Sequence, residues 1–343
     1  MKLNKKRGAI IIALCLLLAL MVGCTSAPAP ATQPTETTQP TETTTAQVEP
    51  MYCPWEYDVS EKADGKLHYY FMASGGMQVN TSSTKWGDAT LIVFPNGETM
   101  LVDSGQVGYA PVLLENLKRM GIEKLDYLLL THSHSDHING AVTEGGLFDS
   151  LPIGQVYISG VYNGKLNLHN DRIEDPYLVD KLCEEKDIPV QILQQGDVLA
   201  FGDVTMRILW PDKALVNQQI VGTEEVNNGS LVLRFEYGDH ASIFPGDIYV
   251  SGEEALLAIY KDEPELLRAE LLKMPHHGGN TSNSMEFAAA IQPKLAIGSG
   301  YTNVTSKVKS VYEVCGSEIL SDKKNGYIHV VTDGTDMTWE TSQ

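Results

Sequence analysis

The sequence predicts an α/β domain with two mixed β-sheets in the middle and helices on the outside. From residue 51 onward, short apolar runs that are typical of strands alternate with longer segments of helical periodicity. Some neighbouring strands are separated by turn signals and others by a helix, which predicts both antiparallel and parallel pairing. No linker-like stretch interrupts residues 51–343, so we expect this part of the chain to form a single domain.

The first half of this domain is predicted to combine a hairpin with strand–helix–strand units. Pro95-Asn96-Gly97 supplies a hairpin turn, and Gly121 is placed to end the predicted helix Ala110–Met120. The predicted helices are Ala110–Met120, with apolar residues on one face, and Asp175–Lys186. The predicted strands are Lys66–Met72, Thr90–Phe94, Met100–Asp103, Leu125–Thr131, Val156–Ser159 and Pro189–Leu193.

The second half begins with hairpins and continues with alternating helices and strands. Gln194–Pro211 is interpreted as a strand pair, and Asp212–Asn228 as a polar loop. Gly238-Asp239 marks a hairpin turn between the next two strands. The remaining predicted helices are Gly252–Tyr260 and Ser284–Ala290. The remaining predicted strands are Leu231–Tyr237, Ala241–Phe244, Leu271–Met274, Leu295–Ile297, Tyr327–Val331 and Asp336–Glu340.

The N-terminal segment has the pattern of an export signal. A basic start at residues 2–7 precedes an apolar run at residues 8–22, which is too short for a typical membrane-spanning helix. The small residues before Cys24 resemble the lipobox of bacterial lipoproteins, which implies cleavage after residue 23 and lipid attachment to Cys24. Residues 1–23 are therefore interpreted as a lipoprotein signal peptide, 24–50 as a lipidated cysteine with a disordered tether, and 51–343 as the folded domain.

The tether and the charge of the mature chain bear on location and partners. Thr25–Pro50 is rich in Thr, Pro and Glu and has no large apolar core residues, so it is expected to act as a spacer. Loss of residues 1–23 would leave 21 basic and 44 acidic side chains, a net charge of −23. Such a surface disfavours indiscriminate binding to polyanions. We expect an extracellular domain held at the outer face of the cell membrane through its lipid alone, and no protein partner is predicted.

Histidines are concentrated at two places in the sequence. Residues 131–137 read Thr-His-Ser-His-Ser-Asp-His and directly follow an apolar strand, where α/β folds place their functional sites. In an extended segment His132 and His134 point the same way and can converge on one metal ion, while Asp136 and His137 can serve a second. His276 and His277 form the other group. Imidazole and carboxylate ligands suit Zn²⁺, and also Mn²⁺ or Fe, in an open catalytic site.

The pattern His132-x-His134-x-Asp136-His137 resembles the HxHxDH signature of the metallo-β-lactamase superfamily. Other segments follow in the order of that family, and the resemblance covers about residues 66–335. Residues 273–279, with the sequence Lys-Met-Pro-His-His-Gly-Gly, closely resemble a segment of the hydrolase domain of ComEC-type DNA-uptake proteins. The other matching segments are Gly87–Ala89, Leu101–Gly105, Asn227–Leu233 and Phe244–Asp247. The resemblance implies an αββα sandwich and a free-standing relative of the ComEC-type hydrolase domain.

The resemblance also implies a site with two divalent metal ions, Zn²⁺ in the first instance with Mn²⁺ or Fe as alternatives. His132 and His134 would bind one ion, and Asp136, His137 and His277 the other. Asp247 would bridge the two. The implied metal ligands are therefore His132, His134, Asp136, His137, Asp247 and His277.

The resemblance also suggests roles for residues outside the six implied ligands, and one histidine that is common in the family has no obvious counterpart here. Asp103 would support the metal loop by hydrogen bonding. His276 would contact substrate or donate a proton. Many members of the family supply another histidine to the first metal, from the interval between the signature and the bridging aspartate. In this chain the histidines of that interval are His169 and His240. His169 lies in the polar loop Asn163–Asp175 and could contact metal or substrate, whereas His240 is expected in a solvated hairpin turn.

These features predict a metal-dependent hydrolase, with Asp247, His276 and Asp136 as the catalytic groups. Two divalent ions can lower the pKa of a shared water toward 7 and stabilise charge that develops on oxygen, which suits phosphodiesters. The expected substrates are small or polymeric phosphodiesters, including nucleic acid. Two alternatives remain open: a lactonase, thioesterase or β-lactamase-type hydrolase using the same ions, and a surface lipoprotein that binds without catalysis.

Overall fold

The computed structural model describes residues 52–55, 63–73, 87–164, 177–300 and 302–343. These residues all lie in one compact unit, Gln47–Gln343. The predicted signal peptide, Cys24, the tether and His169 lie outside the described residues. No helix among the described residues is long and apolar enough to cross a membrane.

In the described part of the chain, one sheet has eight strands in the order β17-β16-β1-β2-β3-β4-β5-β7. Within this order, neighbours from β17 through β16, β1 and β2 to β3 pair in antiparallel fashion. Strands β3, β4, β5 and β7 are parallel to one another. The mixed sheet expected from the sequence is therefore confirmed. Its strands are β1 (Leu67–Phe71), β2 (Thr90–Val93), β3 (Thr99–Val102), β4 (Leu125–Leu130), β5 (Ile153–Ser159), β7 (Val190–Leu193), β16 (Ile328–Thr332) and β17 (Met337–Thr341).

A second mixed sheet has seven strands within the described residues, in the order β15-β14-β13-β12-β11-β9-β8. Strands β8, β9, β11 and β12 are antiparallel, and β12 to β15 are parallel. These strands are β8 (Val198–Phe201), β9 (Val204–Trp210), β11 (Val232–Tyr237), β12 (His240–Phe244), β13 (Leu271–Lys273), β14 (Leu295–Gly298) and β15 (Glu318–Ser321). A short parallel pair, β6 (Val161–Asn163) and β10 (Gln218–Ile220), stands apart from both sheets.

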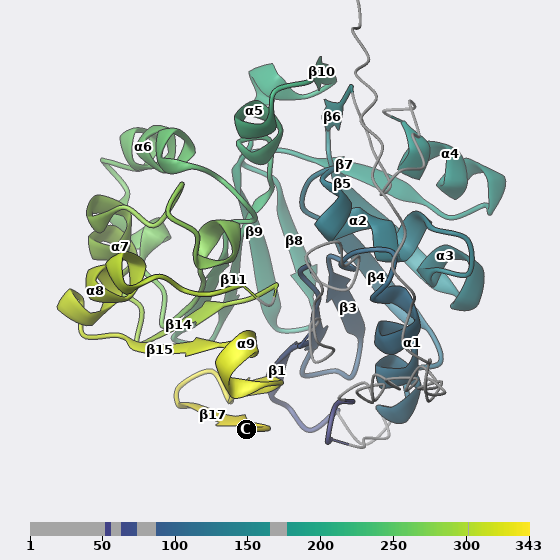
Figure 1. Cartoon of the computed structure of the whole chain (residues 1–343), viewed down its shortest axis with the longest axis horizontal. Coiled ribbons are helices and arrows are strands. Elements are labelled where there is room, and N and C mark those ends of the chain that lie inside the picture. Colours follow the sequence, from purple (N-terminus) through teal and green to yellow (C-terminus); the bar gives the residue numbers. More distant parts are fainter. Residues whose placement is uncertain (1–51, 56–62, 74–86, 165–176, 301) are drawn as a thin grey trace, which may run out of the picture. The chain divides into compact units, whose positions relative to one another are not determined.

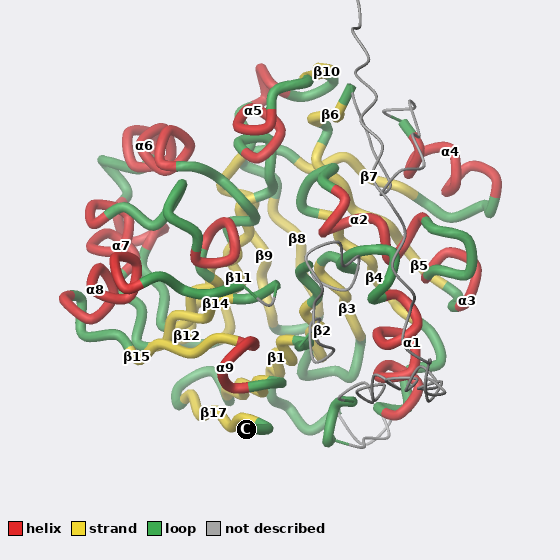
Figure 2. Tube along the Cα trace, in the orientation of Figure 1, coloured by secondary structure: helices red, strands yellow, loops and turns green. Residues whose placement is uncertain are grey.

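The helices cover the outer faces of the two sheets, as Figures 1 and 2 show. Buried side chains of helices α1 to α4 pack with the eight-stranded sheet, and those of helices α6 to α8 pack with the seven-stranded sheet. A third apolar cluster fills the space between the sheets. The longer helices are α1 (Ala110–Arg119), α2 (Ser135–Val142), α4 (Leu178–Glu185), α6 (Val250–Ile259), α7 (Met285–Ile291) and α8 (Ser306–Val314). The shorter ones are α3 (Leu147–Ser150), α5 (Thr223–Asn227) and α9 (Asp322–Asn325).

Alternation along the central strands explains how one sheet can contact two apolar layers. In β4, Leu128 and Leu130 pack toward the helices, whereas Leu129 packs between the sheets. In β2 the same alternation separates Leu91 from Ile92. Successive side chains of a strand point to opposite faces, so a continuous apolar run produces a sheet that is buried on both sides. The αββα architecture expected from the sequence is confirmed.

Three expectations for individual segments were wrong. The polar loop expected at Asp212–Asn228 contains β10 and α5. These elements are short and polar, so they have no apolar periodicity. His240 does not lie in a solvated turn: it begins β12 and its exposed fraction is 3%. The helix α2 was also not expected, because its residues are buried almost all round and show no polar face.

Candidate metal centre

The candidate site lies where parallel strands of both sheets end. In the eight-stranded sheet, Asp103 follows β3 directly and the segment Thr131–His134 joins β4 to α2. In the seven-stranded sheet, Asp247 follows β12 by a short turn, and His277 follows β13. Because β3 and β4 are parallel, as are β12 and β13, these residues emerge at the carboxyl ends of neighbouring strands.

One oxygen of Asp247 lies at the centre of the cluster. Its Oδ2 atom is 3.1 Å from Nε2 of His137, 3.2 Å from Nε2 of His277 and 3.9 Å from Nε2 of His132. Oδ2 of Asp136 is also 3.1 Å from Nε2 of His277 and 3.8 Å from Nε2 of His137. Two imidazole nitrogens and two carboxylate oxygens therefore face one another, a donor set that suits a divalent transition metal.

A second carboxylate lies behind each of the two central imidazoles. Oδ2 of Asp103 is 2.8 Å from Nδ1 of His137. Oδ1 of Asp88 is 3.3 Å from Nδ1 of His277, and the other oxygen of Asp88 forms an ion pair at 2.5 Å with the ammonium of Lys273. A carboxylate on the outer nitrogen fixes the ring orientation and directs the other nitrogen at the metal. Asp88 is thus a supporting residue, although it also lies close enough to count among potential ligands.

His132 and His134 form the other half of the cluster. Nε2 of His132 is 3.1 Å from Nδ1 of His134. Two nitrogens bound tetrahedrally to one zinc ion at about 2.0–2.1 Å would lie about 3.3 Å apart, so this pair fits a shared ion. The hydroxyl of Thr131 is 3.1 Å from Nδ1 of His132 and donates a hydrogen bond of 2.8 Å to Asp103. Asp103 therefore orients His137 directly and His132 through Thr131.

The charge of the cluster supports the binding of cations. Among the described residues of the site, four buried carboxylates face a single buried ammonium, that of Lys273. The carboxylates are those of Asp88, Asp103, Asp136 and Asp247. Buried charges are costly unless they are paired. Asp247 also has its second oxygen, Oδ1, buried without a hydrogen-bond partner among the described residues. The residues present therefore fit divalent ions.

The pKa shifts of these groups follow from the same crowding. Burial alone would raise the pKa of Asp247, but the imidazoles of His137 and His277 outweigh it and hold that pKa well below its usual range. Burial alone would lower the pKa of His137 and His277, but the surrounding carboxylates raise both well above the ordinary value. A metal ion that binds these nitrogens must displace their protons, so metal binding is coupled to proton release.

His276 lies at the edge of the cluster and is only partly buried. Its Nδ1 atom is hydrogen-bonded to the hydroxyl of Thr281, and its ring centroid is 4.9 Å from that of Tyr249. Both His276 and His277 have a positive φ, 46° and 58°, which non-glycine residues rarely adopt. Burial lowers the pKa of His276, so its imidazole is neutral at pH 7. A neutral ring suits hydrogen bonding to substrate better than donation of a full proton.

Gly87 explains how Asp88 reaches the cluster. Its φ is 114°, and a β-carbon at this position would lie 2.1 Å from the carbonyl oxygen of Asp136. The amide of Asp88 donates a 3.0 Å hydrogen bond to that same carbonyl. The close approach of these two backbone segments therefore requires glycine at position 87. It places Asp88 behind His277.

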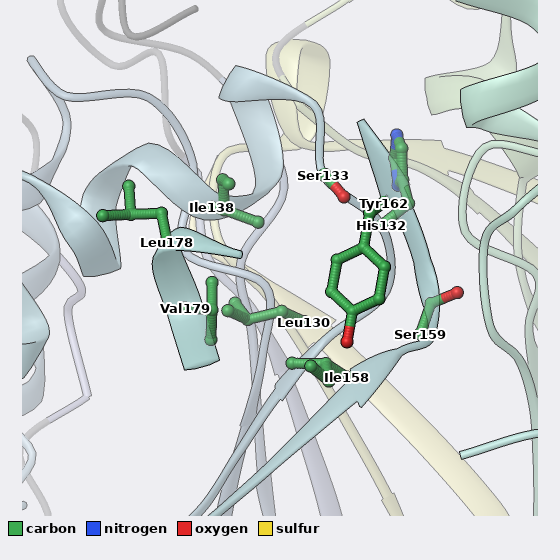
Figure 3. Close-up of a pocket in the computed structure, with 9 residues that line it drawn as sticks. All are labelled: Leu130, His132, Ser133, Ile138, Ile158, Ser159, Tyr162, Leu178 and Val179. Atoms are coloured by element: carbon green, nitrogen blue, oxygen red, sulfur yellow. The ribbon is translucent and has the colours of Figure 1, made fainter. Parts of the chain in front are cut away.

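A small cavity adjoins His132 on one side. Figure 3 shows the ring of Tyr162 in this cavity, with Ser133 and Ser159 near it and Leu178 and Val179 on the opposite wall. Its volume is ≈ 30 Å³, and most of its lining is apolar. A cavity must offer at least about 10–15 Å³ to hold one water, so this space fits one or two waters and no substrate.

The structure brings together all the implied ligands that it describes: His132, His134, Asp136, His137, Asp247 and His277. Asp103 lies directly behind them. His240 does not reach the cluster, because it starts β12 whereas Asp247 follows the other end of that strand. Sequence reasoning gave no role to Asp88 or Lys273. Both stood within recognised segments, but only the fold shows that they pair behind His277.

Comparison with known proteins identifies the family. A profile of the metallo-beta-lactamase superfamily matches residues 87–297, more than half of the 343 residues. The chain belongs to the metallo-beta-lactamase superfamily. This superfamily implies divalent metal ions, and the cluster around Asp247 is the candidate site for them. The chain is therefore a metallo-beta-lactamase superfamily hydrolase.

Curated proteins with related sequences include two that are much longer than this chain. ComE operon protein 3 of Bacillus subtilis is 28% identical over 224 residues, covering 63% of this chain and 26% of that protein. Competence protein ComA of Neisseria gonorrhoeae is 25% identical over 233 residues, covering 66% and 28%. The expected likeness to ComEC-type hydrolase domains is confirmed. The chain spans about a quarter of the length of these curated relatives.

Solved structures include similar folds at low sequence identity. The metallo-beta-lactamase fold protein YhfI from Bacillus subtilis is 15% identical, with a TM-score of 0.46. The similarity covers 74% of this chain and 95% of that one.

Proposed function

We propose that this protein is an exported, lipid-anchored hydrolase that uses two divalent metal ions to cleave phosphodiesters. The observation that carries the proposal is the position of Asp247 Oδ2, which lies 3.1 and 3.2 Å from two imidazole nitrogens and 3.9 Å from a third. A single oxygen among three imidazoles suits a carboxylate that bridges two ions. The choice of phosphodiesters follows from the likeness of residues 273–279 to the ComEC-type segment.

Two bound ions would supply an activated water and stabilise negative charge on the reacting group. The residues of this chain fix where that chemistry takes place. Asp247 and Asp136 present carboxylate oxygens to the same space as the imidazoles, so they orient the attacking water by accepting its hydrogen bonds. Asp103 and Asp88 hold the rings of His137 and His277 in place and limit the reorganisation required during the reaction.

His276 is placed to recognise the substrate. Its Nδ1 atom is held by Thr281 and its ring lies against Tyr249, so the direction of Nε2 is fixed. The lowered pKa keeps the ring neutral, and its N–H can donate a hydrogen bond to a phosphoryl oxygen. His276 would therefore bind the substrate rather than act as the principal proton donor.

The location follows from the sequence of the N-terminal segment. The basic start, the apolar run and Cys24 support export followed by lipid attachment, and Thr25–Pro50 provides a spacer. With its acidic surface, the domain would be held at the outer face of the membrane by the lipid alone. Substrates would then be extracellular phosphodiesters, either small molecules or polymers such as nucleic acid.

The test uses the full chain, purified in detergent and loaded separately with zinc and manganese. We expect hydrolysis of bis(p-nitrophenyl) phosphate that a chelator abolishes. Asp247→Asn should lower kcat by on the order of 10³-fold, because it weakens the shared ligand of both ions. Asp64→Asn is the matched control, since Asp64 also lies 3.2 Å from a histidine but outside the cluster.

The outcomes distinguish the alternatives. Turnover that is unchanged in Asp247→Asn would overturn the assigned mechanism. Activity on lactones or nitrocefin without activity on phosphodiesters would replace the substrate class while keeping the metal centre. Folded protein that binds metal but hydrolyses none of these substrates would favour a binding role.

A further inference from the structure

The two halves of the metal centre have unequal sets of ligands. In one half, Nε2 of His137 and Nε2 of His277 each lie 3.1–3.8 Å from carboxylate oxygens of Asp136 and Asp247. Within the described part of the chain, the histidine nitrogens of the other half are those of His132 and His134. Neither histidine considered from the sequence completes this half among the described residues, because His240 starts β12 far from Asp247 and His169 is not described.

Asn227 is the polar residue that the structure places beside the weaker half. It is the last residue of α5, its exposed fraction is 1%, and its side chain lies next to the imidazole of His134. Its carbonyl oxygen, Oδ1, is buried and meets no described donor with good hydrogen-bond geometry, although the side chain lies within hydrogen-bonding reach of the His134 imidazole and favours its protonated form. A buried carbonyl without a well-aligned donor is unfavourable and therefore requires an explanation.

The backbone around Asn227 is fixed to the rest of the centre by hydrogen bonds. The amide of Leu231 donates to the carbonyl of Thr131, the residue before His132, at 2.9 Å. The amide of Asp247 donates to the hydroxyl of Ser230 at 3.0 Å. Asn228 is held in addition, because its side chain accepts a 2.8 Å bond from the amide of Tyr249. The turn that carries Asn227 is thus joined to both the histidine loop and the bridging carboxylate.

We propose that Oδ1 of Asn227 is a further protein ligand of the metal ion that His132, His134 and the bridging Asp247 bind. This inference rests on the metal centre of the proposed function and is independent of the substrate. A neutral amide oxygen is a harder and weaker donor than an imidazole nitrogen. It shifts the preference of this half toward ions that favour oxygen, such as Mn²⁺, and lowers its discrimination in favour of Zn²⁺.

The test measures metal binding directly, in the full chain and without substrate. Manganese binding is followed by the EPR signal of free Mn²⁺, and zinc binding by metal analysis after equilibrium dialysis. We expect two ions per chain in the unmodified protein. Asn227→Ala should lower the affinity for the more weakly bound ion by at least about 10-fold and leave the affinity for the more tightly bound ion unchanged.

Two conservative variants separate ligation from a structural role. Asn227→Asp keeps an oxygen donor and should retain both ions. Asn227→His supplies an imidazole and should raise the ratio of Zn²⁺ to Mn²⁺ affinity at the weaker site by at least about 10-fold. In the Co²⁺-substituted protein, Asn227→His should also change the visible absorption of one ion and not of both.

Asn139 offers a matched control. It is fully buried and its Oδ1 also lacks a partner among the described residues, but it bonds to Gln106 through its amide nitrogen. Asn139→Ala should therefore keep two ions of unchanged affinity. Two ions of unchanged affinity in Asn227→Ala would overturn the inference, as would equal losses in Asn227→Ala and Asn139→Ala.

The experiment also separates this inference from the proposed function. Dependence of the weaker ion on Asn227 in a protein without phosphodiesterase activity would sustain the inference and refute the proposed substrate. Phosphodiesterase activity in a protein whose Asn227→Ala variant holds both ions unchanged would do the reverse.

Discussion

Two clusters of buried histidines in this domain differ in how their nitrogens are used. In the cluster of β1 and β16, Nδ1 of His68 is 3.0 Å from Nε2 of His329. The outer nitrogens bond to Asp64 at 3.2 Å and to Glu340 at 3.1 Å, so four groups form a linear chain. In the metal centre, by contrast, three imidazoles converge on one oxygen of Asp247.

The difference shows what distinguishes a metal site from a hydrogen-bonded core. In the linear chain each ring nitrogen has its own hydrogen-bond partner, and the ring of His329 stacks on that of Tyr70 at 4.2 Å. Such a chain satisfies its polar groups by itself. In the metal centre several nitrogens and carboxylate oxygens compete for the same space, and a cation can satisfy them together. The convergence of ligand atoms, rather than the number of histidines, identifies the site.

The strongest test replaces one histidine from each cluster by asparagine. His137→Asn should remove one ion and lower hydrolysis by on the order of 10³-fold, because His137 contacts the bridging carboxylate. His329→Asn should keep both ions and the activity while lowering the free energy of unfolding by about 1–3 kcal/mol, through lost buried hydrogen bonds. Metal analysis and urea unfolding would measure the two effects. Loss of metal in His329→Asn would remove the distinction between the clusters.

A smaller effect is expected one step away from the ligands. Asp103→Asn should weaken metal binding by about 10–100-fold, because Asp103 orients His137 directly and His132 through Thr131. High metal concentrations should then restore much of the hydrolysis. Isothermal titration with Mn²⁺ would measure the affinity. An affinity equal to that of the unmodified chain would show that the carboxylate behind the ring contributes little here.

The sequence predicted those parts of the site that a short segment determines. Three histidines and an aspartate within six residues of a buried strand predict their own proximity, whatever surrounds them. Asp88, Lys273 and Asn227 come from three distant segments, and their proximity to the cluster depends on how the two sheets pack. The local sequence around Asn227 also predicted a polar loop, because α5 is too short to show periodicity.

The fold was predicted in the same uneven way. The central strand β4 has a continuous apolar run that only a doubly buried strand explains, and its bounds agree with the prediction within one residue. The neighbouring strand β5 begins three residues earlier than predicted. The helix α2 could not be recognised, because its polar residues Asp136, His137 and Asn139 are buried together with its apolar residues and no polar face is exposed. Its burial follows from the contact between the sheets and the loop of the site. Amphipathic periodicity therefore fails where function places polar groups inside.

His240 sharpens the comparison because it is buried and belongs to neither cluster. Its Nε2 atom has no hydrogen-bond partner among the described residues, and its Nδ1 atom is 3.9 Å from the carboxylate of Glu270. Burial lowers its pKa to about 4; Glu270 opposes this shift, and the positive charges of Lys294 and Arg234 add to it. The native state therefore keeps His240 neutral at a pH at which the unfolded chain is protonated.

This histidine should make the domain less stable in mild acid. Between the unfolded pKa of about 6.5 and the native pKa of about 4, the unfolded chain binds more protons, so the free energy of unfolding falls as the pH is lowered. The loss over this range is at most about 3 kcal/mol. His240→Phe should remove that part of the pH dependence while leaving hydrolysis unchanged. Urea unfolding of the unmodified protein and of His240→Phe, both in chelator at pH 7, 6, 5 and 4, would measure the difference in the free energy of unfolding. Parallel pH profiles for the two proteins would show that His240 is not the group that titrates.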